Sequence, residues 1–338
     1  MTEAQILEYI KDPNIFGYAI VRPFGLIIMA IYNFVQNYGL TVILFALLVK
    51  LILIPLAIKG KKSMMAMNAM NAELQQLQKK YANNREKLND EMQKLYEKHG
   101  VNPMLGCLPQ FIPLPIMMGL YYAVEQPLQY ILGLSKESVA ALGQLVGIEK
   151  ITNSYTVQIE IAEKLNQFIG SNGQFTSQVT SLSEEIKNLL VPIDFNFFGL
   201  NLAATPSFKD PSIMWIIPIL SGVTAFLSSF VMQKMQGNNA QAGAAANQMK
   251  VMNAIMPLFS LYFGFILPGA IGIYWIFNNV FTCVQEVVLT KYFRNKQEKK
   301  ETEAARLLAE EKATKKAANQ AIQQQQQSQS AKNKKGDK

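Results

Sequence analysis

Four apolar runs stand out along a chain whose other segments are rich in polar side chains. They share a length of twenty residues or more and at most one charged residue each: 39–58, 104–124, 213–232 and 251–290. A helix needs about 20 such residues to cross the roughly 30 Å of hydrocarbon in a bilayer. The last run has about twice that length and contains Pro268-Gly269, so we predict two spans there, 251–267 and 270–290. The pattern predicts an all-α polytopic membrane protein with five transmembrane helices, since four such runs are rare in a soluble core.

The segments between the runs differ in the sign of their charge. Nine Lys or Arg stand against five acidic residues in 59–98, and thirteen stand against six in 291–338. Segment 125–212 has the opposite balance, five against nine. Because cytoplasmic segments of membrane proteins are enriched in Lys and Arg, we predict that the first two segments are cytoplasmic. The third segment and the N-terminal residues 1–38 are then outside, and the C-terminus is inside.

The polar segments have secondary-structure patterns of their own. Residues 22–37 have the apolar face of a short amphipathic helix lying in the outer membrane interface, a sixth short span being the alternative. Segment 125–212 contains three apolar-periodic stretches that predict a small external helical elaboration, at 137–148, 155–169 and 178–191. Residues 233–250 form a cytoplasmic loop. The tail 291–338 passes through QQQQQSQS, so we predict a helical start followed by disorder in most of the rest.

Residues 59–103 predict a cytoplasmic helical hairpin. Asn83-Asn84 suits a turn and an N-cap of the second arm, and Gly100 suits a helix stop. The first arm, near residues 60–81, is rich in methionine, at Met64, Met65, Met67 and Met70. Methionine surfaces adapt to varied partners, so these four residues are candidates to receive a client, although methionine also packs helices against each other.

Lys50 is the most informative residue, because it is the twelfth of the twenty residues in the run 39–58. A lysine near the bilayer centre costs about 2.5–3.5 kcal/mol on insertion scales, so polar partners are expected. At 1.5 Å per residue, Lys50 lies roughly 16 Å below the outer edge of its span. The same arithmetic places polar residues of the other spans at mid-depth or towards the cytoplasm: Gln110, Thr224, Ser228, Asn278, Asn279, Thr282 and Gln285.

This distribution favours a one-sided hydrophilic groove that opens to the cytoplasm. A channel needs a polar path between both faces, and an ion-coupled transporter usually has carboxylates near the bilayer centre. The outer halves of these spans are nearly all apolar instead. Two simpler interpretations stay open. Ser, Thr and Asn side chains also join transmembrane helices, and Lys50 could pair with Glu286, although their depths differ by about 7–8 Å.

The composition excludes several classes of protein and site. Two Cys cannot form a disulfide framework in a chain of 338 residues, and with a single His they supply few zinc ligands. The sequence has no GxxxxGK[ST] motif for nucleotide binding, and no Ser-His or paired-Asp set accompanies the spans. We therefore expect no enzyme activity, no metal and no cofactor.

Four stretches of the sequence resemble the YidC-type membrane protein insertase family, which has mitochondrial and chloroplast relatives. In chain order they are NYGLTVILFALLVKLILIPLAIKGKKSM, YEKHGVNPMLGCLPQFIPLPIMMGLYYAV, PSIMWIIPILSGVTAFLSSFVMQKM and MKVMNAIMPLFSLYFGFILPGAIGIYWIFNNVFTCVQEVVLTKYF. The HGVNPMLGCLP and PGAIGIYW segments are the most specific. The resemblance covers residues 20–125 and 192–293.

The resemblance implies five core helices around a hydrophilic groove that is open to the cytoplasm and to lipid, in a bacterial plasma membrane. The family's groove has a cation, usually arginine, in its first core span, and Lys50 takes that place; lysine keeps the charge and loses the bidentate geometry. The implied function is a membrane protein insertase and chaperone, which receives nascent hydrophobic segments and releases them into the bilayer. Nascent membrane proteins, the lipid bilayer, the ribosome (through the basic tail), the Sec translocon and the signal recognition machinery are the implied partners.

Two other functions are compatible with these residues. One is a small-anion or solute transporter that binds its substrate at Lys50, and the other is a packing scaffold for a membrane complex. The basic tail likewise suits anionic lipid as well as ribosomal RNA.

Overall fold

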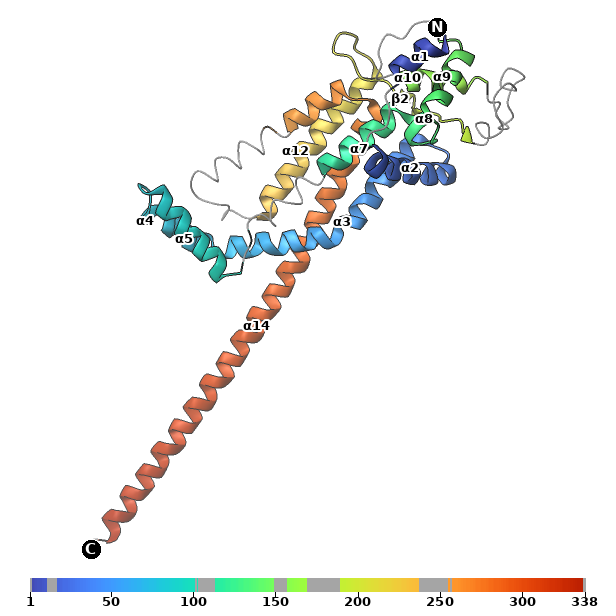
Figure 1. Ribbon diagram of the computed structural model, residues 1–338. Helices are drawn as coiled ribbons and strands as arrows, with labels where there is room; N and C mark the ends of the chain where they lie inside the picture. Colours follow the sequence, from blue (N-terminus) through green and yellow to red (C-terminus); the bar gives the residue numbers. More distant parts are fainter. Residues whose placement is uncertain are drawn as a thin grey trace. The chain divides into compact units, whose positions relative to one another are not determined.

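Helices form almost all of the regular structure in the computed structural model (Figure 1). The structure describes residues 2–10, 17–100, 102, 113–148, 157–168, 189–236, 255 and 257–336. The chain divides into two units, Met1–Glu286 and Val287–Lys338. The predicted all-α class is confirmed at this level, with one two-stranded sheet as the exception among the described residues.

Helix α3 (Tyr38–Ala69) begins at an asparagine cap and continues beyond the apolar run. The Asn37 side chain accepts a hydrogen bond from the Leu40 N–H at 2.9 Å, which satisfies one of the free amides of the first turn. The helix passes residue 58, the predicted end of the first span. Pro55 lies inside it and removes a backbone donor, and Figure 1 shows α3 bending along its length.

Two helices in the described part of the chain are long and apolar enough to cross a membrane. One is α3, and the other is Ile213–Met235, which comprises the short 3-10 helix η3 (Ile213–Trp215) and most of α12 (Ile216–Gln236). They correspond to the first and third predicted spans. Shorter apolar helices are Ala19–Val35 and Pro257–Ile266.

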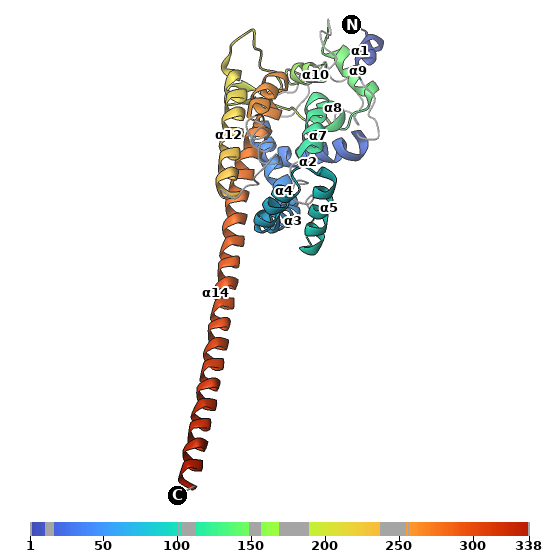
Figure 2. The same ribbon diagram turned by 90° about the vertical axis from the view of Figure 1, so that its left-hand side faces the viewer.

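The other predicted spans are described in part, so five spans stay a prediction. Helix α7 (Pro113–Glu125) covers the end of the second, Pro257–Ile266 lies within the fourth, and α14 (Gly269–Gly336) begins next to the start of the fifth. A Cβ on Gly272 of α14 would lie 2.2 Å from Cγ2 of Ile217. The missing side chain lets the first turns of α14 approach α12 closely, and Figures 1 and 2 show these two segments side by side.

The predicted hairpin consists of α4 (Asn71–Lys80) and α5 (Arg85–Lys98), which pack against each other. Asn84 caps α5 by accepting a hydrogen bond from the Lys87 N–H at 3.0 Å, and α5 ends before Gly100, whose φ is +59°. Both features agree with the sequence signals. The first arm differs from the prediction, because α3 continues to Ala69 and Met70 forms a joint before α4.

Helix α2 (Arg22–Val35) follows the short π-helix η1 (Gly17–Val21) and corresponds to the predicted interfacial helix. Its Arg22 guanidinium donates to the carbonyl of Tyr130 at 2.9 Å, at the end of the short α8 (Pro127–Tyr130). Terminal helix carbonyls lack partners within the helix, so Arg22 satisfies one of them. A Cβ on Gly25 would lie 1.9 Å from the same carbonyl oxygen, so α2 and α8 meet at backbone distance.

Among the described residues between α8 and η3 there are two helices, α9 (Lys136–Leu145) and α10 (Val157–Leu165), and the sheet of β1 (Asn196–Phe197) and β2 (Leu200–Asn201). Helices α9 and α10 correspond to the first two predicted stretches, whereas most of 178–191 lies outside the described residues. The N-terminal α1 (Glu3–Tyr9) packs on α9 and buries Ile6 completely. The sequence reading predicted neither α1 nor the sheet, because both are too short to show a period.

The second unit contains the rest of α14, which extends to Gly336. This differs from the disorder that we predicted for most of the tail. The physical reason is composition: no Pro or Gly lies between Gly272 and Gly336, and Ala, Glu, Gln, Lys and Arg are good helix formers. Ion pairs one turn apart, Arg294–Glu298 and Arg306–Glu310, add support.

Candidate functional site

One segment, 192–204, ties together the ends of three helices. The Tyr32 hydroxyl of α2 donates to the carbonyl of Pro192 at 3.0 Å and accepts the Asp194 N–H at 3.1 Å. The Tyr38 ring, at the start of α3, packs edge-on against Phe195 with the ring centroids 4.9 Å apart. The start of α3 is therefore held against this segment.

The same segment caps the start of α14. The N–H groups of Gly269 and Ala270 donate to the carbonyls of Ala204 and Leu202 at 2.9 and 2.8 Å. First-turn amides have no acceptor within their own helix, so these bonds fix where α14 begins. The starts of α3 and α14 are thus joined at one end of the helical core.

Lys50 on α3 contacts α14 through a hydroxyl. Its Nζ donates to Oγ1 of Thr282 at 2.7 Å, and that hydroxyl donates in turn to the carbonyl of Asn278 at 2.6 Å. Lys50 and Thr282, two members of the predicted groove set, are therefore in direct contact, and their depth in the membrane stays a prediction. Lys50 forms no ion pair with any of the residues that the structure describes.

A second polar contact joins α14 to α12. Nδ2 of Asn279 lies 3.4 Å from Oγ1 of Thr224, whose hydroxyl is also within reach of the carbonyls of Leu220 and Ser221 in its own helix. The buried Ser221 hydroxyl lies 3.4 Å from the carbonyl of Ser260. Polar side chains of α3, α12 and α14 therefore form two neighbouring contacts along one stretch of α14.

An ion pair between Lys61 and Glu286 lies farther along the same helices. The exposed fraction is 4% for the lysine side chain and 12% for the glutamate side chain, so the pair is largely buried. The alternative that Lys50 pairs with Glu286 is wrong, because Glu286 pairs with Lys61. The depth estimate treated α3 as straight, whereas the bent helix brings two lysines eleven residues apart onto α14 residues four apart.

In the part of the chain that the structure describes, the remaining predicted groove residues have no side-chain contact that would place them in a groove. Ser228 is buried, while Asn278 and Gln285 are half-buried, and no side-chain hydrogen bond of these three is found among the described residues. Gln110 lies outside the described residues. The whole groove set stays a prediction, within which Lys50, Thr282, Asn279 and Thr224 are the members in side-chain contact.

The four methionines of the predicted client surface divide into two kinds. Met70 is 2% exposed and forms a small core with Leu74 and Leu95, so it packs the hairpin together. Met64, Met65 and Met67 are half-buried on the end of α3. Met70 is therefore inaccessible to a client while the hairpin is folded, and the other three stay candidates.

The surface of the hairpin holds ordinary exposed ion pairs. Lys94 Nζ lies 2.8 Å from the carboxylate of Glu91, and this hydrogen bond lowers the pKa of Glu91 and raises that of Lys94. Such exposed pairs contribute little to stability. Within the described part of the chain no group of His, Cys, Asp and Glu is arranged to hold a metal ion.

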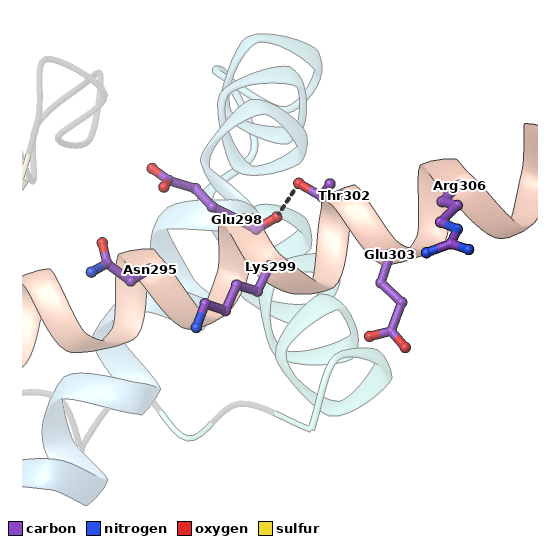
Figure 3. A pocket seen from close by; sticks show the side chains of 6 residues that line it. All are labelled: Asn295, Glu298, Lys299, Thr302, Glu303 and Arg306. Carbon is purple, nitrogen blue, oxygen red and sulfur yellow. Dashed lines mark hydrogen bonds between the residues drawn. The ribbon is translucent and has the colours of Figure 1, made fainter.

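A shallow surface hollow lies on the second unit and is lined by residues of one helix, α14. Figure 3 shows its six lining side chains along one face of α14, at Asn295, Glu298, Lys299, Thr302, Glu303 and Arg306. Thr302 donates to the carbonyl of Glu298 at 2.8 Å, within the helix. Its charges are mixed and no second wall encloses a ligand, so we assign it no binding role.

The sequence analysis did not predict the ion pair of Lys61 or the hydrogen bonds of Tyr32. A signal for Lys61 exists, because it follows Lys50 by eleven residues and therefore shares its helix face. Thr282 and Glu286 share a face in the same way. No comparable signal exists for Tyr32, whose partners are backbone groups 160 and 162 residues away.

A family model described as 60Kd inner membrane protein matches residues 30–299. The chain belongs to this family. The family resemblance found in the sequence is thereby confirmed. The matched residues include the two membrane-length helices, the hairpin and the start of α14.

Individual members of the family match most of the chain at low identity. "Membrane protein insertase YidC 2" of Listeria innocua is 28% identical over 275 residues, covering 80% of this chain and 70% of the relative. "Membrane protein insertase YidC" of Clostridium perfringens is 29% identical over 293 residues, covering 84% and 94%. The Fusobacterium nucleatum protein of the same name is 25% identical over 259 residues, covering 77% and 89%. These names give no support to the transporter alternative.

Proposed function

We propose that this protein is a membrane protein insertase of a bacterial plasma membrane. A nascent apolar segment with a short acidic flank enters a cytoplasm-open groove between α3, α12 and α14, and then passes into lipid. The observation that carries the proposal is Lys50, a cation in the apolar part of α3 that bonds to the neutral hydroxyl of Thr282. Family membership supports the same function.

The neutral partner of Lys50 matters for the mechanism. A carboxylate at this place would cancel the field of the ammonium group, whereas a hydroxyl orients it and leaves its positive charge. Inside a membrane the attraction between opposite charges is stronger than in water. Lys50 therefore lowers the cost of bringing an acidic flank into the groove, and no covalent chemistry or cofactor is required.

The contacts around Lys50 support a groove open on one side. Thr224, Asn279 and Thr282 supply polar groups that can replace water at the backbone of a client in transit. The segment 192–204 joins the starts of α3 and α14, on the side where the sequence places the outside. The polar groups then face the cytoplasm, and the topology has the N-terminus outside and the C-terminus inside.

The test uses cells depleted of the native protein and supplied with one variant. The Lys50→Glu and Lys50→Ala variants should block or slow translocation of the short acidic tails of single-span clients. The Lys50→Arg variant, which keeps the positive charge, should translocate these tails normally. Lys209→Glu is the matched control, because it makes the same charge change at an exposed residue outside both the groove and the hairpin. Normal insertion of acidic-tailed clients by the Lys50→Glu protein would remove the groove charge from the mechanism.

The second unit is proposed to bind the ribosome. Segment 291–338 holds thirteen Lys or Arg against six acidic residues, and basic patches bind RNA in a salt-dependent manner. Truncation after Tyr292 should abolish salt-sensitive co-sedimentation with ribosomes. Co-sedimentation that survives truncation would contradict this role, and binding of the isolated tail to anionic vesicles alone would assign it to lipid.

The hairpin is proposed to receive clients and targeting partners. Met64, Met65 and Met67 are half-buried on the end of α3, next to the polar contacts of Lys61. The Sec translocon and the signal recognition machinery are the partners that we propose for this side of the protein. Photo-crosslinking from Met67 during synthesis of a client tests the assignment, and the absence of client adducts would contradict it.

A further inference from the structure

The turn of the β1–β2 hairpin places a phenylalanine where the backbone disfavours one. Phe197 pairs with Leu200, so two residues, Phe198 and Gly199, connect the strands. Their φ angles are +51° and +80°. Positive φ at both central positions is required in a type I′ turn, where Asn-Gly and Asp-Gly are favoured. A phenylalanine at the first position is strained, because its Cβ crowds the backbone in the left-handed region.

The Phe198 side chain gains little from the rest of the molecule. It is 88% exposed, and its aromatic contact within the described residues is the edge-on neighbour Phe197, with centroids 4.7 Å apart. A strained and exposed apolar residue is not explained by the stability of the folded chain. Such outliers point to a contact outside the molecule.

The hairpin is fixed at the corner where α2 leads into α3. A Cβ on Gly39, the second residue of α3, would lie 2.3 Å from the Phe197 ring, so strand and helix are in close contact. Tyr32 holds the chain before β1 through its two hydrogen bonds. The turn therefore sits in a defined place beside the first residues of an apolar, membrane-length helix.

Exposed apolar side chains lie on the elements that meet at this corner, next to the exposed polar residues Asp194 and Asn196. Phe34 near the end of α2 is 91% exposed. Leu40, Leu44 and Leu47 form an exposed stripe along α3, since positions four and three residues apart share a helix face. Residues 195–208 contain no charge. These exposed apolar side chains therefore lie on elements that adjoin the start of the membrane-length α3.

We propose that Phe198, together with Phe34, inserts into the outer leaflet at the boundary between headgroups and acyl chains. The hairpin then anchors the external part of the protein on the lipid surface. Aromatic and apolar side chains are favoured at this boundary, where the ring contacts acyl chains. The inference rests on the membrane placement in the proposed function and goes beyond the groove.

The test measures the depth of the turn by fluorescence. Full-length Phe198→Trp protein is placed in phosphatidylcholine and phosphatidylglycerol vesicles that contain a phosphatidylcholine brominated near the carbonyl end of its acyl chains. The wild-type protein gives the background of Trp215 and Trp275. Gln144→Trp is the matched control, because Gln144 is exposed and lies on α9, which packs against α1, α8 and α10. Brominated lipid should quench the added emission of Phe198→Trp and leave that of Gln144→Trp unchanged.

Equal quenching of the two variants would overturn the proposal. So would emission of Phe198→Trp that is shielded from aqueous iodide and unaffected by brominated lipid, because that result assigns the turn to a protein contact. No client is present in the measurement. A failure of client insertion with normal quenching would therefore contradict the proposed function alone.

Discussion

Glu286 on α14 forms an ion pair with Lys61 of α3, whereas Lys50, also on α3, donates a hydrogen bond to the hydroxyl of Thr282. The two lysines of α3 therefore contact α14 through partners of different charge. The buried ion pair neutralises one lysine and fastens the end of α3 to α14. The other lysine has a neutral partner, the hydroxyl of Thr282.

Breaking the Lys61–Glu286 pair should destabilise the protein. Lys61→Met or Glu286→Gln leaves the partner charge largely buried, which costs roughly 3–5 kcal/mol in such pairs. The swapped double variant Lys61→Glu with Glu286→Lys should recover most of the loss in thermal unfolding in detergent. Lys94→Ala is the control, since its pair with Glu91 is exposed. Equal effects of Lys61→Met and Lys94→Ala would contradict the role of the buried pair.

Replacing Thr282 by valine should lower stability through Lys50. The valine keeps the volume and removes the acceptor of the ammonium, a loss of about 1 kcal/mol for a partly exposed group. In the Lys50→Met background the same substitution should cost much less, because no donor is left unsatisfied. Thermal unfolding of the four proteins measures the coupling, and additive effects would mean that the 2.7 Å contact contributes nothing.

Gly25→Ala should disrupt the contact of α2 with α8. The new Cβ would lie 1.9 Å from the Tyr130 carbonyl oxygen, so the backbones must separate, at about 1–3 kcal/mol for overpacking. Gly222→Ala is the matched control, because its nearest neighbour is a Leu261 side-chain atom at 3.3 Å. Unfolding temperatures that fall equally in both variants would contradict the prediction.

Met70→Ala should loosen the hairpin. Met70, Leu74 and Leu95 form its buried core, and removing a buried methionine side chain costs about 2 kcal/mol at the low end of such substitutions. Amide hydrogen exchange in α4 and α5 should become faster, with little change in α12. Met67→Ala is the control on the half-buried surface, and faster exchange with that variant instead would reverse the assignment.

Phe198→Asn should stabilise the isolated protein. Asparagine tolerates the left-handed region, so the turn should gain about 1 kcal/mol relative to phenylalanine. Chemical unfolding in detergent should show a higher midpoint than for the wild type. Phe197→Ala at the neighbouring, packed position should lower the midpoint instead. A lower midpoint for Phe198→Asn would show that the ring stabilises the fold.

The sequence by itself determined the class and family of the protein, and it singled out Lys50, the residue on which the proposed mechanism is based. Long apolar runs, a segregated charge and specific motifs indicated an all-α membrane protein of a known family, because hydrophobic length and charge act locally along the chain. Lys50 stood out for the same reason: an isolated charge in an apolar run is costly wherever the helix lies.

Only the tertiary structure decided which groups meet. Glu286 pairs with Lys61 because α3 bends, and a bend changes which residues of two helices are neighbours. Met70 belongs to a core because α4 folds back on α5. The segment 192–204 joins α2, α3 and α14 through backbone carbonyls and amides, which every residue has and which therefore leave no trace in the sequence. Phe198 became informative only when its backbone angles and exposure were known.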